Sequence, residues 1–101
     1  MTEALVLHGR EGTIIVAASA LEGVVVRAAE SVEGARVRKP KRTVQVAHEP
    51  GRASVSFELA VERGVRVPDL AQVVQERVAE ALAATTGLEI ERVDVVVGEI
   101  G

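Results

Sequence analysis

Hydrophobic and polar residues alternate most regularly between Ala53 and Glu62, and this alternation predicts a β-strand with one buried face. The apolar side of the pattern holds Val55, Phe57, Leu59 and Val61, and the polar side holds Ser54, Ser56, Glu58 and Glu62. Residues 43–47 alternate in the same way, with Val44 and Val46 on one side. The Pro50-Gly51 pair indicates a turn over residues 48–52. Together the two segments predict an antiparallel hairpin with one buried and one solvated face.

Two other segments repeat with the helical period of 3.6 residues. The first starts at Ala17, and its apolar face consists of Leu21, Val24, Val25, Ala28, Ala29 and Val32. Gly34 stands where a glycine commonly ends a helix. The second helix is expected over residues 68–86, because Pro68 suits a first helical position and Gly87 suits a C-terminal cap. Its expected buried stripe is Leu70, Ala71, Val74, Val78, Ala81 and Leu82.

Three further segments have strand character. Residues 12–16 (GTIIV) are a short β-branched run and are expected to form the first strand. Residues 35–39 could continue as strand before Pro40 interrupts them. The last strand is expected over residues 88–97, and its parity breaks at Glu91-Arg92, which predicts a bulge or a fresh strand start there.

This order of elements predicts an α+β fold with β-α-β-β-α-β order in a single small domain. We expect two helices on one face of a mixed four-stranded sheet, with the other face polar or covered by a partner. The expected domain covers residues 11–98, preceded by a short N-terminal extension (residues 1–10) and followed by a C-terminal end (residues 99–101).

Composition narrows the classes of function. The chain has 101 residues, a net charge of −3 and one aromatic residue, Phe57, so it lacks the aromatic rings on which single-stranded nucleic acids usually stack. It contains no cysteine, which excludes disulfides and thiolate metal sites. Neither a signal peptide nor a run of about 20 apolar residues is visible. We therefore expect a cytoplasmic protein without a membrane span.

No residue set predicts catalysis, a cofactor or a metal. His8 and His48 are the only histidines and are expected to be exposed, and no nucleophile-elbow sequence surrounds any serine. The acidic residues of the last strand predict a solvated edge more readily than a metal cage; they are Glu89, Glu91, Asp94 and Glu99. Gly9-Arg10-Glu11-Gly12 matches the G-x-x-G loop of KH domains, but it precedes a strand instead of joining two helices. The match is therefore expected to be accidental.

Two features are candidates for an interaction site. The first is the basic segment, residues 36–42, in which five of seven side chains are cationic: Arg36, Arg38, Lys39, Lys41 and Arg42. Such clusters bind phosphates, lipid headgroups or acidic partners, and the alternative is a solvated loop that protects a strand edge. The second is Val26, expected to project from the polar face of the first helix beside Ser19 and Gly23, where a neighbouring element could approach closely. The alternative there is an ordinary isolated apolar residue.

The chain resembles the alkaline-shock/Gls-type envelope stress response family of bacteria. The resemblance is carried by Glu62-Arg63-Gly64-Val65-Arg66-Val67-Pro68 before the second helix, Val74-Gln75-Glu76-Arg77-Val78 inside it, Thr86-Gly87-Leu88 after it and Val93-Asp94-Val95-Val96-Val97 in the last strand. Residues 12–16 and Val32-Glu33-Gly34 agree more loosely, so the resemblance covers about residues 11–98. Arg63, Arg66 and Thr85 depart from it, since family members often carry an aromatic residue, Asn and Met there.

The resemblance implies a non-enzymatic cytoplasmic protein that self-associates, joins the inner side of the membrane through partners and serves envelope homeostasis. Our leading hypothesis is accordingly an interaction or scaffold module that forms a homo-oligomer and docks to a membrane-anchored protein partner. The alternative is a small nucleic-acid-binding protein that uses the basic segment, although the acidic net charge weighs against nucleic acid as a partner.

Overall fold

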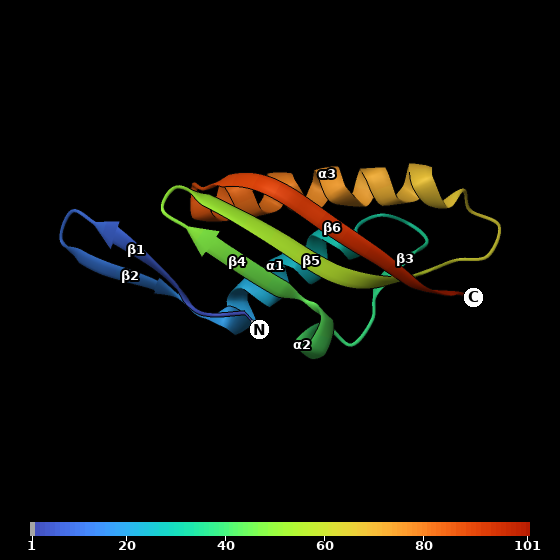
Figure 1. The fold of residues 1–101 in the computed structure, drawn as a ribbon, viewed down its shortest axis with the longest axis horizontal. Coiled ribbons are helices and arrows are strands. Elements are labelled where there is room, and N and C mark those ends of the chain that lie inside the picture. The colour runs from blue at the N-terminus through green and yellow to red at the C-terminus, as the bar shows by residue number, and fades with distance from the viewer. Residues whose placement is uncertain (1) are drawn as a thin grey trace.

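A computed structural model describes residues 2–101, and its elements form two separate sheets (Figure 1). In chain order the elements are β1 (Leu5–Gly9), β2 (Gly12–Val16), α1 (Ala18–Glu30), β3 (Ala35–Val37), α2 (Pro40–Thr43), β4 (Gln45–Glu49), β5 (Arg52–Val61), α3 (Val67–Thr86) and β6 (Glu89–Ile100). Strands β1 and β2 make a two-stranded sheet, and β3, β4, β5 and β6 make a four-stranded one.

Strand β5 is the centre of the larger sheet. Strands β3 and β4 run antiparallel to it and occupy successive lengths of the same edge, β3 beside residues 59–61 and β4 beside residues 52–56. Strand β6 runs parallel to β5 along the whole of the other edge. The predicted α+β class, the mixed four-stranded sheet and the antiparallel hairpin are therefore confirmed.

The hydrophobic core lies between this sheet and the two long helices. All four residues on the apolar side of β5 are at most 3% exposed: Val55, Phe57, Leu59 and Val61. The helices contribute the same face that the sequence predicts, with Leu21, Val25 and Ala29 from α1 and Leu70, Val74, Val78 and Leu82 from α3. Helices α1 and α3 lie behind the sheet in Figure 1, so its front face is left open.

The two long helices end by different means. Helix α3 ends at Thr86, and Gly87 follows in the left-handed conformation with its N–H bonded to the carbonyl oxygen of Ala83 at 2.8 Å, as predicted. The prediction that Gly34 ends the first helix is wrong, because α1 ends at Glu30. Ser31 turns its hydroxyl back onto the carbonyl oxygen of Ala28 at 2.7 Å and closes the last turn. Gly34 instead has φ of +91° in the turn that leads into β3.

The strand predicted at residues 12–16 exists as β2, but it does not belong to the main sheet, and β3 takes the fourth place there. Strand β2 pairs with β1 in a tight hairpin whose ends are closed by the Leu5↔Val16 and Gly9↔Gly12 pairs. The G-x-x-G stretch over residues 9–12 that matched a KH loop is the turn of this hairpin. Pairing with an immediate neighbour closes a very short loop and costs little chain entropy, which favours β1 as the partner.

The last strand confirms the predicted irregularity. Ile90 pairs with Ala53 and Arg92 with Ser54, so Glu91 is the extra residue of a bulge. Strand β6 continues to Ile100, past the predicted end at residue 97, and the register shifts again at Gly98. Helix α2 is a single turn that the sequence analysis did not predict, with Pro40 at its first position.

Candidate interaction surfaces

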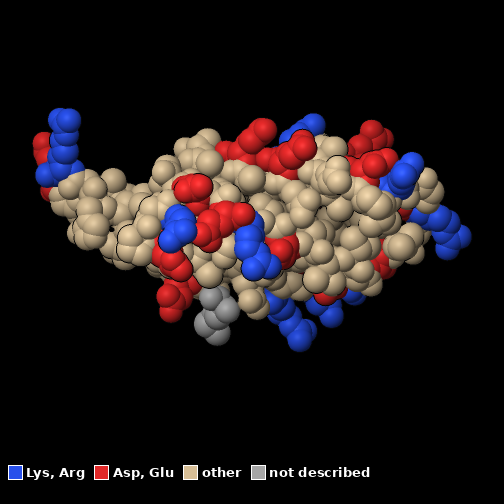
Figure 2. Space-filling view, turned by 45° about the horizontal axis from the view of Figure 1, so that its top comes forward, with Lys and Arg blue, Asp and Glu red and all other residues tan. Residues whose placement is uncertain are grey.

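The open face of the main sheet carries small and charged side chains. A shallow hollow of about 180 Å³ on this face is lined by Gln45, Ala47, Ser54, Ser56 and Asp94. Toward the carboxyl end of β6 the apolar side chain of Val96 is 60% exposed and lies beside Glu58 of β5. Acidic and basic side chains are intermixed on the face turned toward the viewer in Figure 2. Such a surface suits contact with another protein better than the enclosure of a small ligand.

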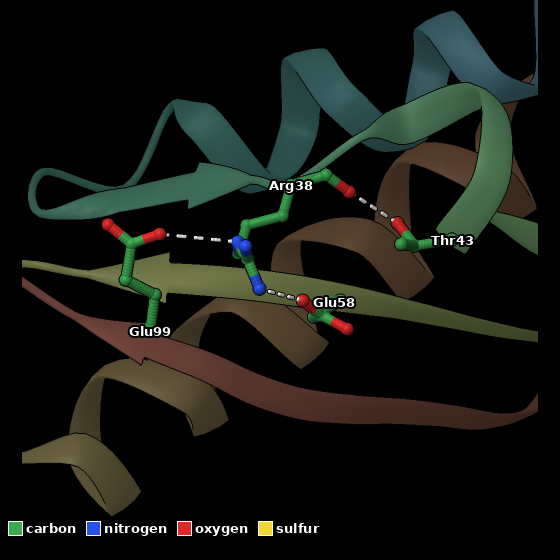
Figure 3. A network of polar contacts seen from close by, with 4 residues as sticks. All are labelled: Arg38, Thr43, Glu58 and Glu99. Carbon is green, nitrogen blue, oxygen red and sulfur yellow. Dashed lines mark hydrogen bonds and ion pairs between the residues drawn. The ribbon is translucent and has the colours of Figure 1, made fainter.

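Arg38 is the centre of a polar network on this face (Figure 3). Its guanidinium pairs with the carboxylates of Glu58 on β5 and of Glu99 on β6, the latter at 3.3 Å from Nε to Oε1. Its carbonyl oxygen accepts a hydrogen bond from the hydroxyl of Thr43 at 2.6 Å. Gly98 leaves the room for this network, because a Cβ there would lie 2.7 Å from Cδ of Glu58. Arg38 therefore ties the segment after β3 to two strands and is engaged internally.

The other cations of the basic segment point outward. Arg36 is exposed on β3, Lys39 precedes α2 with φ of +43°, and Lys41 and Arg42 are exposed on α2. Arg36 borders a groove that also contains Glu33, Glu62 and Glu99. The structure therefore separates the five cations of the basic segment into one with internal partners and four at the surface, and acidic side chains lie next to the cluster.

Val26 does not stand out from α1 as the sequence analysis expected. It is half-buried and packs against the hydrophobic core. Ser19 is exposed on α1, and Gly23 is half-buried with the guanidinium of Arg27 lying over it. A Cβ at Gly23 would be 3.2 Å from Nη1 of Arg27, the end of an exposed and flexible side chain.

The hairpin of β1 and β2 is a surface that the sequence analysis missed. It projects from the end of the molecule (left in Figure 1), and the chain measures 51 Å along its longest axis against 21 and 18 Å across. Six large apolar side chains are exposed among residues 2–101, and three belong to this hairpin: Val6 at 48%, Ile14 at 53% and Ile15 at 68%. The signal that could have found it is the G-R-E-G turn between two apolar runs, LVL and TIIV.

A mostly apolar groove of about 520 Å³ separates β1 from the turn between β4 and β5. One wall consists of residues 5–8, and the other consists of residues 48–51 and Leu88. The expectation that both histidines are exposed is confirmed for His8 and wrong for His48, which is half-buried. Nε2 of His48 is buried and has no hydrogen-bond partner among the residues that the structure describes.

Neither a membrane span nor a metal site was found in the described part of the chain. No helix within residues 2–101 combines the length and the apolar character needed to cross a bilayer. Within the same residues, His, Asp and Glu side chains do not gather in a group of three or more that could hold a metal ion.

Comparison with known proteins places the chain in a family. No curated protein and no solved structure matches it. A model of the alkaline shock protein 23 family, described as having a cell envelope-related function, matches residues 11–101 and so covers nearly the whole chain. This match confirms the resemblance found in the sequence, and it begins after β1. The chain belongs to the alkaline shock protein family, whose function is related to the cell envelope.

Proposed function

We propose that this protein is a non-enzymatic scaffold of the cell envelope, which associates with copies of itself and docks to a protein held at the membrane. The proposal rests on two surfaces that the other elements of the fold leave uncovered. The open sheet face and the projecting apolar hairpin are both suited to contacts with other proteins.

The exposed apolar residues support self-association. Monomeric proteins scatter single apolar side chains over the surface, whereas grouped ones mark contact sites. Here Val6 and Ile15 pair with each other on one face of the β1–β2 hairpin, and Ile14 is exposed on its other face. A chain with a net charge of only −3 also repels its own copies weakly.

Docking to a membrane-anchored partner is the second part of the proposal. It rests on the envelope-related function of the family, and the open sheet face offers a place for it. We propose that the protein itself stays cytoplasmic and reaches the membrane through that partner.

The nucleic-acid alternative has less support. Arg38 is held by two carboxylates, Arg36 shares a groove with Glu33, Glu62 and Glu99, and Glu22 lines the same hollow as Lys41 and Arg42. A phosphate backbone would have to compete with these internal charges.

The test is the solution mass of the protein, measured by light scattering with a refractive-index detector at several concentrations and two salt levels. Absorbance at 280 nm cannot serve, because the chain has neither Trp nor Tyr. We expect species of at least twice 10.6 kDa that persist at high salt, because apolar contacts are not screened. A strict monomer at all concentrations would refute self-association.

A further inference from the structure

We infer that the β1–β2 hairpin is the surface of self-association, and that the hairpin of a second copy occupies the groove between β1 and the β4–β5 turn. The exchange is reciprocal, so each copy supplies one hairpin and one groove. This inference rests on the proposed self-association and names the surface that performs it.

Most of the surface of the hairpin has no partner within residues 2–101. In that part of the chain its two strands pair only with each other, so each has one edge of backbone N–H and C=O groups free. Leu5 at its base is buried in the main core, but beyond it Val6, Ile14 and Ile15 are about half exposed or more. A two-stranded hairpin in water is marginal by itself, and further strands or a packed face are what stabilise it.

The strands also lack the features by which proteins keep a free edge from pairing. Such edges usually carry charged residues, above all Lys, or Pro. Neither residues 4–9 nor residues 12–21 include Asp, Glu, Lys, Arg or Pro. The only such charges on the hairpin are Arg10 and Glu11 at its tip, and they are of opposite sign. Two copies of this segment can therefore lie side by side without repulsion between like charges.

The free edges also identify the occupant as a strand. A lipid surface could cover the apolar side chains, but it would leave the N–H and C=O groups of both edges without hydrogen-bond partners, which is costly in an apolar medium. A second hairpin covers the side chains and pairs the backbone at once. In a two-fold symmetric dimer both copies use the same surface, so the hairpin of each copy contacts the groove of the other.

The area that a stable dimer needs explains why the groove must take part. Strands of five residues make a ribbon about 17 Å long and roughly 10 Å wide, so one face offers on the order of 170 Å². Stable interfaces bury about 800 Å² on each partner. Contact between two hairpin faces alone falls far short. Reciprocal insertion also covers the second face and one edge of each hairpin and the opposite wall of each groove, formed by residues 48–51 and Leu88, so it buries several times the area of one face.

The test compares charged substitutions at two sites of matched exposure. In Ile15→Glu the new carboxylate lies on the hairpin, where the native side chain is 68% exposed, and in Val96→Glu it lies on the open sheet face, where the native side chain is 60% exposed. We expect the light-scattering mass of Ile15→Glu to fall to the 10.6 kDa of one chain while Val96→Glu keeps the mass of the native protein. Val6→Glu, which changes the residue paired with Ile15, should reproduce the loss. The helical circular dichroism signal of each variant is compared with that of the native protein to check that the variant folds.

The outcomes separate this inference from the proposed function. If the native protein self-associates and both hairpin variants keep its mass, the hairpin is not the interface and the scaffold proposal stands. If the native protein is a strict monomer, both are wrong. If Ile15→Glu leaves the mass unchanged but abolishes co-sedimentation with phosphatidylglycerol vesicles, the hairpin binds lipid and the inference is overturned.

Discussion

Replacing Phe57 by Ala should remove a large part of the stability of the fold. Phe57 is the only aromatic residue, is 2% exposed and lies on the core side of β5, where it faces α1 and α3 and pairs in register with Val95 of β6. Truncation of a buried Phe costs about 3–5 kcal/mol, and the upper part applies where the cavity cannot collapse. Because β5 is the central strand, its backbone has little freedom to close the gap, so we expect about 4 kcal/mol.

This loss is large against the total stability of a domain of this size, which is roughly 5–15 kcal/mol. It corresponds to a fall in melting temperature of about 15–30 °C. The assay is urea unfolding followed by the far-ultraviolet circular dichroism of the helices, at one fixed protein concentration because self-association adds concentration-dependent stability. Val96→Ala, on the open face, is the control and should change stability by less than about 0.5 kcal/mol. A loss below about 1 kcal/mol for Phe57→Ala would refute the described core.

Three further substitutions test other parts of the structure. Gly98→Ala should cost about 1 kcal/mol in urea unfolding, because its Cβ would lie within 3 Å of the Glu58 carboxylate and of Nη1 of Arg38 and would separate this pair. The cost should be smaller in a Glu58→Ala background, where there is no pair to separate, and equal costs in both backgrounds would contradict this packing. His48→Leu should raise the unfolding free energy by about 1 kcal/mol, since it removes a buried nitrogen that has no hydrogen-bond partner among the described residues. A clear loss of stability would show that this nitrogen does form a hydrogen bond. We expect the native protein to bind a labelled single-stranded DNA only weakly in fluorescence anisotropy, and Lys39→Gln to bind it equally weakly. Tight, salt-sensitive binding by the native protein that falls tenfold in Lys39→Gln would favour the nucleic-acid alternative.

The parts of the fold that the sequence predicted are those in which one face must be buried. The alternation along β5 and the helical faces of α1 and α3 follow directly from that requirement, and the parity break at Glu91 predicted the bulge because a strand cannot change face without one. These features depend on neighbours in the chain, so a local pattern is enough to find them.

The features that could not be predicted from the sequence depend on which distant segments of the chain pair or pack together. Residues 35–37 belong to the main sheet because they pair with residues 59–61, far away in the sequence, whereas residues 12–16 pair with residues 5–9 across a short turn. Arg38 looked like one of five equivalent cations, and only the approach of Glu58 and Glu99 separates it from the rest. Val26 has a polar-face position by helical period, yet the fold buries half of it.

The hairpin was missed for a different reason. Residues 12–16 were predicted as a strand of the main sheet, and the apolar run before the G-x-x-G turn was not predicted as its partner. The exposed apolar residues of these strands add nothing to the core of their own chain, since they lie outside it. If a second copy buries these residues, as we propose, the search for one buried face within a single chain does not detect them.

The most direct test of the central claim is the distance between hairpins in the associated protein. The chain has no cysteine, so Glu11→Cys at the hairpin tip gives a single site for a nitroxide label, whose intermolecular distances are measured by double electron–electron resonance. Reciprocal insertion of ribbons about 17 Å long predicts tips about 20–40 Å apart. The absence of intermolecular coupling in a self-associated sample, or a distance beyond the 51 Å length of the molecule, would contradict association through the hairpin.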